Sequence, residues 1–214
     1  MIFTFATTTL DAQVSVKNPF TFTLNYYFDG LVGRFNSYHT SLFLPYNPSA
    51  IELTINKIST GNKPWHRYYN YPIAGLSIAY YDYRSTDPLG DLGKTFAITP
   101  FFEQFLIRRK NWSFSISPGL GLAYHTVVYD PITNFKNNSI SSPITAGFIG
   151  DFKLKIKLSQ YLALQCTYTF RHFSNGAVRL PNPGTNFLFT PNSTFTCIFL
   201  SNVRIVSRLH LGDW

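Results

Sequence analysis

The sequence predicts an all-β chain, folded as a small antiparallel transmembrane β-barrel of about eight strands. The chain is 45% hydrophobic and 18% aromatic, whereas only 13% of its 214 residues are charged. That charged share is about half of what a soluble domain carries. No stretch approaches the ~18 uninterrupted apolar residues of a membrane-spanning helix. A barrel satisfies its backbone within lipid and is therefore the favoured structure, with a soluble β-sandwich or lipocalin-type barrel as the alternative.

Apolar and polar residues alternate along most of the chain with the two-residue period of a β-strand. The alternation begins at residues 20–28 and places the first barrel strand somewhere between residues 19 and 45. Ile51, Leu53 and Ile55 alternate with polar residues and predict a second strand. Further strands are expected over residues 76–80, 96–106, 112–124, 148–158 and 162–174.

The polar faces of two of these strands favour the membrane barrel over the soluble one. Residues 112–124 have only Ser, Gly and Ala on that face, which fit the narrow interior of a small barrel. Residues 148–158 have an aspartate and three lysines there, which we expect to pair inside the barrel with Glu103 or Glu52. The large apolar side chains of both strands would then face lipid.

The expected connections alternate in length, as they do in bacterial outer-membrane barrels. Short turns are predicted at 109–111 and 159–160, and these belong on the periplasmic side. Long loops are predicted at 84–93, 127–142 and 175–185, and these belong on the outer side. The expected localisation is therefore the bacterial outer membrane.

The barrel itself is assigned to residues 13–200. Residues 1–12 resemble the end of a secretory signal peptide, with a small-residue cleavage site before Gln13. A short first strand is the alternative for this segment. Residues 201–214 form a C-terminal tail to which the sequence assigns no role.

The net charge of +8 suggests an anionic partner. Lys and Arg are scattered along the chain, except in the cluster 108–110, so phosphorylated lipid headgroups fit better than nucleic acid. Cys166 and Cys197 do not make a metal site, and we interpret them as small apolar side chains, although a disulfide remains possible. No metal ion or other cofactor is predicted.

His172 and Ser174 form the candidate reactive pair. They lie two residues apart at the end of a predicted strand, so they share a face, and the alternation places them in the lipid-facing row. Polar groups that face hydrocarbon are costly and usually have a function. At this end of the strand they would lie near the outer headgroups, where a lipid presents its acyl esters. The alternative is a strand-end His and Ser satisfied by interfacial water.

An imidazole next to a serine hydroxyl can accept its proton and so activate it as a nucleophile. The oxyanion that would form needs fixed donors, for which Asn175 and the backbone N–H groups around Gly176 and Ala177 are candidates. No Asp or Glu lies between residues 152 and 212 to orient the imidazole. Asn186 could accept its second ring N–H, as the Asn of Cys-His-Asn enzymes does.

The run His172-Phe173-Ser174-Asn175-Gly176-Ala177 resembles the motif of the lipid A 3-O-deacylase family, also called outer-membrane acyloxyacyl hydrolases. The later residues that extend the resemblance are Pro181, Asn182, Gly184 and Asn186. Members are eight-stranded outer-membrane barrels that remove an ester-linked acyl chain from lipid A. The resemblance implies that His172 is the base, Ser174 the nucleophile and Asn175 the oxyanion-site residue. Asn186 stands where the family has a glutamate, and Gly-Ala replaces the family's Ala-Gly.

The sequence therefore predicts an outer-membrane serine esterase that hydrolyses a (3-hydroxy)acyl ester of lipid A or lipopolysaccharide. Its site would use Ser174 and His172, with Asn186 orienting the imidazole. Two alternatives are a catalytically idle structural or lipid-binding barrel, which Asn186 favours, and an outer-membrane phospholipase. The expected partners are lipid A and the membrane lipids, and not nucleic acid.

Overall fold

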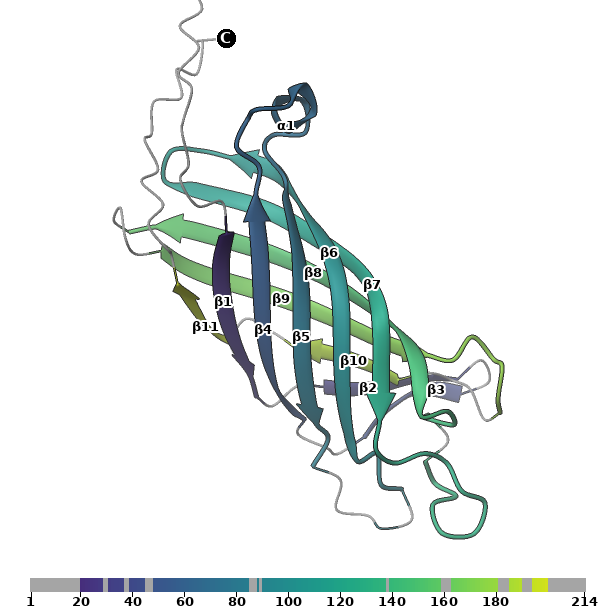
Figure 1. Cartoon of the computed structure of the whole chain (residues 1–214). Coiled ribbons are helices and arrows are strands. Elements are labelled where there is room, and N and C mark those ends of the chain that lie inside the picture. Colours follow the sequence, from purple (N-terminus) through teal and green to yellow (C-terminus); the bar gives the residue numbers. More distant parts are fainter. Residues whose placement is uncertain are drawn as a thin grey trace, which may run out of the picture.

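The structure is a computed structural model of the chain (Figure 1). It describes residues 20–28, 31–36, 39–44, 48–84, 88, 90–137, 139–158, 163–180, 185–189 and 194–199. The predicted signal-peptide remnant and the C-terminal tail lie outside these residues, so the division into residues 1–12, 13–200 and 201–214 stays a prediction. The described helix, α1 (Pro64–Tyr68), is too short to cross a membrane.

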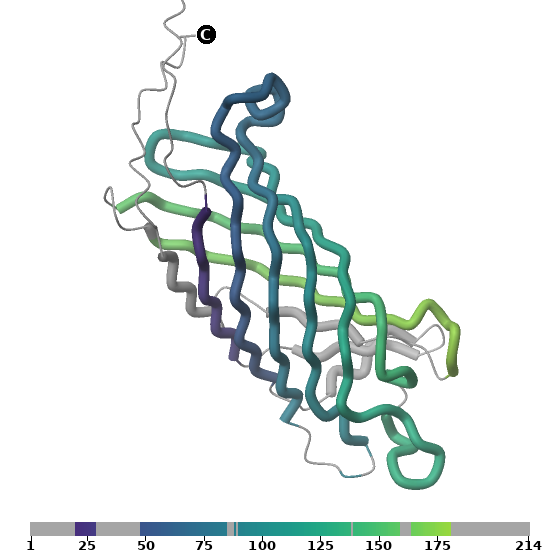
Figure 2. Tube along the Cα trace, viewed as in Figure 1, coloured from purple at the N-terminus to yellow at the C-terminus, as the bar shows by residue number. Residues whose placement is uncertain are grey.

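The described residues form one antiparallel sheet of eleven strands that curls into a barrel (Figures 1 and 2). Seven strands are consecutive neighbours in it: β1 (Phe20–Tyr27), β4 (Ser49–Ile58), β5 (Ile73–Asp82), β6 (Lys94–Arg108), β7 (Trp112–His125), β8 (Ile144–Lys157) and β9 (Ala163–Ser174). The four shorter strands are β2 (Leu31–Asn36), β3 (His39–Leu44), β10 (Thr185–Phe189) and β11 (Thr194–Phe199).

The two short C-terminal strands pair with opposite ends of the row of seven longer strands. β10 pairs with β9, whereas β11, which follows it in the chain, pairs with β1 and also contacts β9. The described residues thus form seven long strands and four short ones, where about eight strands were expected. Two of the short strands form the hairpin β2–β3, which pairs with β10. The first barrel strand, which the sequence left open between 19 and 45, is β1, and the rest of that range contains the hairpin.

Burial follows the alternation of the sequence, with the polar side chains inside. On β1, Phe22 and Leu24 are 41% and 40% exposed, whereas Thr23 and Asn25 are 9% and 8% exposed. A soluble barrel would show the opposite arrangement. The interior is narrow on β7, as predicted, because a Cβ at Gly119 would lie 2.7 Å from Cγ1 of Ile149.

Five charged residues in the barrel interior pair with one another: Glu52, Glu103, Asp151, Lys153 and Arg171. Lys153 lies 3.2 Å from Glu103, as the sequence predicted, and 3.5 Å from Asp151. Arg171 on β9 donates to Asp151 on β8 at 2.6 Å and to Glu52 on β4 at 3.2 Å. Since an unpaired buried charge is very costly, these contacts are what make a charged interior tolerable.

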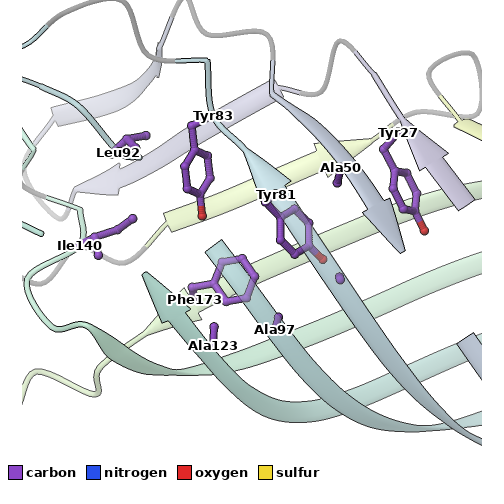
Figure 3. Close-up of a cluster of buried hydrophobic side chains, with 10 residues drawn as sticks. Tyr27, Ala50, Tyr81, Tyr83, Leu92, Ala97, Ala123, Ile140 and Phe173 are labelled. Carbon is purple, nitrogen blue, oxygen red and sulfur yellow. The ribbon is translucent and has the colours of Figure 1, made fainter. Parts of the chain in front are cut away.

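Near the long-loop end the interior is filled by aromatic and aliphatic side chains (Figure 3). Tyr81, Tyr83 and Phe173 lie in this buried cluster, with Leu92 and Ile140 from the loops beside them. The opposite end has the short turn at residues 109–111, the longer connection at residues 59–72 with α1, and the outermost described residues of β1 and β11. The short turn predicted at 159–160 lies outside the described residues.

Candidate active site

The predicted reactive pair lies at the end of β9, where the strand enters a long loop. His172 and Ser174 are half-buried and continue the outward row that contains the exposed Tyr168. Arg171 and Phe173, which alternate with them, are buried inside the barrel. The parity predicted from the sequence is therefore confirmed, and the pair lies on the outer surface of the wall.

His172 stacks on an aromatic ring at this outer surface. Its ring is parallel to that of Phe170, with 6.5 Å between the centroids and 4° between the planes. Phe170 in turn lies 6.2 Å from Phe148, which is the cross-strand partner of His172 on β8. Phe148, Phe170 and His172 therefore lie on the same side of the β8–β9 sheet.

A tight turn directly follows Ser174. The backbone N–H of Gly176 donates to the Oγ of Ser174 at 3.1 Å, and the N–H of Val178 donates to the carbonyl of Asn175 at 3.3 Å. Gly176 and Ala177 both have a φ of +64°. For Ala177 this left-handed conformation costs about 1–2 kcal/mol. Because both positions have positive φ, the order Gly-Ala or Ala-Gly leaves one alanine in this conformation either way.

Asn175 connects this turn to the loop between β7 and β8. Its Nδ2 donates to the hydroxyls of Ser141 and Ser142 at 2.9 and 3.0 Å and to the carbonyl of Arg179 at 2.9 Å. Its Oδ1 accepts the N–H of Ala177 at 3.0 Å. The amide therefore has a positioning role in this structure, and its role as an oxyanion donor stays a prediction.

The loop that holds Asn175 is itself well ordered by hydrogen bonds. Asp130 accepts the backbone N–H groups of Thr133 at 2.7 Å and Ile132 at 2.9 Å, and these bonds hold the pKa of its carboxyl below the usual range. Nδ2 of Asn134 donates to the carbonyl of Asp91 in the loop between β5 and β6, at 2.9 Å. The outer loops thus support one another and, through Ser141 and Ser142, the turn after Ser174.

Asn186 is brought next to His172 by strand pairing. It lies on β10 as the Cα partner of His172 in the β9–β10 register, and it pairs with Gly33 of β2 on its other side. Its side chain and the nearby motif residues Pro181, Asn182 and Gly184 lie outside what the structure describes. For Asn186, the third residue of the predicted site, the structure therefore gives the backbone register.

Sequence reasoning missed two groups that support the site. Ser141 and Ser142 hold Asn175, and no signal in the sequence distinguishes these loop serines from others. Arg171 anchors β9 from inside the barrel. Its place on the inward face of the predicted strand, opposite the predicted interior acids, could have indicated this role. Within the described residues, His, Cys, Asp and Glu do not gather in the groups of three that could hold a metal ion.

The sequence model of the family described as "Lipid A 3-O-deacylase (PagL)" matches residues 49–190, which is more than half of the chain. The chain belongs to the lipid A 3-O-deacylase family. It is also similar to a solved structure described as the crystal structure of the outer membrane enzyme PagL, with a TM-score of 0.52 and 14% identity. That likeness covers 81% of this chain and 97% of the other, and at this identity it concerns the fold. A comparison with curated proteins finds no match.

Membership of the deacylase family confirms three predictions: the family itself, the class of ester hydrolases and the outer-membrane barrel. It also supports lipid A as the substrate class. β1 and the hairpin β2–β3 precede the matched residues, so the extra hairpin lies outside the part that the family shares.

Proposed function

We propose that this chain is a lipid A deacylase in which Ser174 is the nucleophile and His172 the general base. The observation that carries the proposal is the position of the pair: both side chains are half-buried on the outward face of β9, at its long-loop end. In an outer-membrane barrel the long loops are extracellular. The pair would then face the outer leaflet near the headgroups, where the acyl esters of lipid A lie.

The chemistry follows that of other serine esterases. Oγ of Ser174 attacks the carbonyl carbon of the acyl ester while His172 takes its proton. The tetrahedral oxyanion needs hydrogen-bond donors, and the candidates are the backbone N–H groups of Gly176 and Ala177 and Nδ2 of Asn175. Each of these groups would exchange the acceptor that it has in this structure for the oxyanion. When the ester bond breaks, His172 returns the proton to the departing hydroxyl of lipid A. Water then hydrolyses the acyl-serine, releases the fatty acid and restores the serine.

Asn186 completes the proposed site by orienting His172. Directly opposed residues of an antiparallel pair share a face of the sheet, and Asn186 is opposed to His172. An amide oxygen can accept the second ring N–H of the imidazole, as in Cys-His-Asn enzymes. It stabilises the imidazolium less than a carboxylate would, since it has no net charge. The carboxylates of Glu52 and Asp151 are engaged inside the barrel with Arg171, on the opposite side of the strand.

The test is to express the wild type and Ser174→Ala and to compare mass spectra of lipid A and phospholipids with those of cells lacking the protein. We expect the wild type to release a 3-hydroxy fatty acid from lipid A, and Ser174→Ala to abolish this release while the barrel keeps its heat-modifiable mobility. The matched control is Ser113→Ala, at the short-turn end of β7, far along the barrel from Ser174. This variant should retain activity.

Other outcomes would decide between the remaining alternatives. Undiminished release by Ser174→Ala would exclude this nucleophile. An unchanged lipid A spectrum with the folded wild type would favour a catalytically idle barrel. Loss of acyl chains from phospholipids alone would indicate a phospholipase.

A further inference from the structure

The short-turn end of the barrel has an exposed aromatic platform on and beside α1. Trp65, Tyr68 and Tyr69 are 42%, 82% and 49% exposed. They project from the connection between β4 and β5, which rises beyond the sheet next to the β6–β7 hairpin (Figure 1). Trp and Tyr rings of this kind are typical of the level where membrane headgroups meet water.

Hydrogen bonds hold this platform in place at the base of α1. The backbone N–H of Gly61 donates to Nδ1 of the buried His66 at 3.1 Å, and the N–H of Tyr71 donates to the carbonyl of His66 at 2.6 Å. The His66 ring contacts that of Trp65 edge-on, with 4.1 Å between the centroids. His66 therefore anchors the helix and packs against Trp65 of the platform.

The platform also covers the free edge of β6. β5 pairs with β6 only as far as Glu103, whereas β6 continues to Arg108. Beyond that point the connection supplies partners: Gln104 donates to the carbonyl of Tyr69 at 2.8 Å, and Arg108 donates to that of Tyr71 at 3.3 Å. The aromatic rings are thus presented by a built structure that continues the wall of the barrel.

Among the described residues, the acids that reach the surface lie at one end of the barrel only, whereas exposed cations lie at both ends; those at the long-loop end are Arg84, Lys94, Lys136 and Arg179. The exposed cations at the platform end are Lys57, Lys63, Arg67, Arg109 and Lys110. Among the described residues, the acids that reach the surface are Asp82, Asp91 and Asp130, and all three lie at the long-loop end. Glu103, the acid nearest the platform in the sheet, is buried and paired with Lys153. The platform end is therefore both aromatic and basic.

We propose that this basic aromatic rim binds the headgroups of anionic phospholipids in the periplasmic leaflet of the outer membrane. Exposed Lys57 continues the outward row of Ile51, Leu53 and Ile55 on β4, from which a lysine can extend its ammonium group to a lipid phosphate. Each Lys or Arg close to an anionic surface strengthens binding by about fivefold at low salt. The inference rests on the outer-membrane placement of the barrel and is independent of Ser174.

The test is lipid retention by the folded full-length protein in zwitterionic detergent, measured by native mass spectrometry with phosphatidylglycerol or phosphatidylcholine. We expect the wild type to retain phosphatidylglycerol preferentially, and Lys63→Gln/Arg109→Gln/Lys110→Gln to lose that preference by at least about tenfold. The control Arg84→Gln/Lys94→Gln/Lys136→Gln removes the same charge at the long-loop end and should keep it. Trp65→Ala/Tyr68→Ala should weaken retention of both lipids.

Two results would overturn the proposal. The first is a rim variant that prefers phosphatidylglycerol as strongly as the wild type does. The second is a control variant that loses this preference as much as the rim variant does, which would mean that only net charge matters. Heat-modifiable mobility of every variant verifies that the barrel is folded. Release of fatty acid from lipid A, measured on the same proteins, separates a failure of this proposal from a failure of the proposed reaction.

Discussion

The two faces of β9 differ in burial and in what their side chains contact. On the inner face, Arg171 is fully buried and donates to Asp151, Glu52 and the hydroxyl of Tyr81. On the outer face, one residue further along the chain, His172 is half-buried and stacks on the ring of Phe170. The comparison shows that one strand supplies both the interior support and the surface site.

Phe173 shows how the inner face supports the outer one. Its ring contacts that of Tyr81 edge-on, with 5.5 Å between the centroids (Figure 3). It also contacts His125 edge-on, with a centroid distance of 5.6 Å. The two ring nitrogens of His125 hydrogen-bond with the hydroxyls of Thr95 at 2.6 Å and Thr145 at 2.8 Å. Phe173 lies between His172 and Ser174 in the chain. Its packed ring therefore holds the backbone from which the side chains of His172 and Ser174 extend. A site on such a rigid wall needs little reorganisation before reaction.

The largest expected effect comes from removing the outer imidazole. His172→Gln should lower lipid A deacylation by about 10⁴-fold or more, because an amide cannot take the proton of Ser174. The urea midpoint of the barrel in vesicles should stay unchanged, since the side chain lies outside the interior network. Activity within tenfold of wild type would show that the two faces do not divide support and chemistry in this way.

Arg171→Met should have the next largest effect, this time on stability. Without the guanidinium, Asp151 and Glu52 lose their buried partner, which typically costs about 3–5 kcal/mol. We expect a lower urea midpoint and reduced heat-modifiable folding. His172→Gln is the neighbouring control. If Arg171→Met matched wild type in stability, the inner network would not be what holds β9.

Asn186→Glu should have the smallest effect, and it should raise activity where the other variants lower activity or stability. A carboxylate opposed to His172 would stabilise the imidazolium and restore the acid of the family, so deacylation should rise by about tenfold. Matched assays of wild type and variant, normalised to folded protein, measure this change. Asn186→Gln, which adds no charge, is the control. A loss of activity in Asn186→Glu would contradict the proposed orientation of His172.

The alternation of the sequence determined which face of each strand is apolar, and therefore that His172 and Ser174 lie outside and Arg171 inside. Low charge and turn lengths determined the membrane barrel and its two ends. These features are local, because side-chain parity within a strand depends only on the neighbouring residues. The motif also carried the family, which the match over residues 49–190 confirms.

Only the tertiary structure decided what these residues meet. The pairing of Asn186 with His172, the hold of Ser141 and Ser142 on Asn175, and the four-residue contact of Arg171 with Asp151, Glu52, Tyr81 and Tyr27 join segments far apart in the chain. The hairpin β2–β3 beside β10 was likewise not expected. Such contacts depend on register and closure of the sheet, which are set by many strands together and which no single strand specifies.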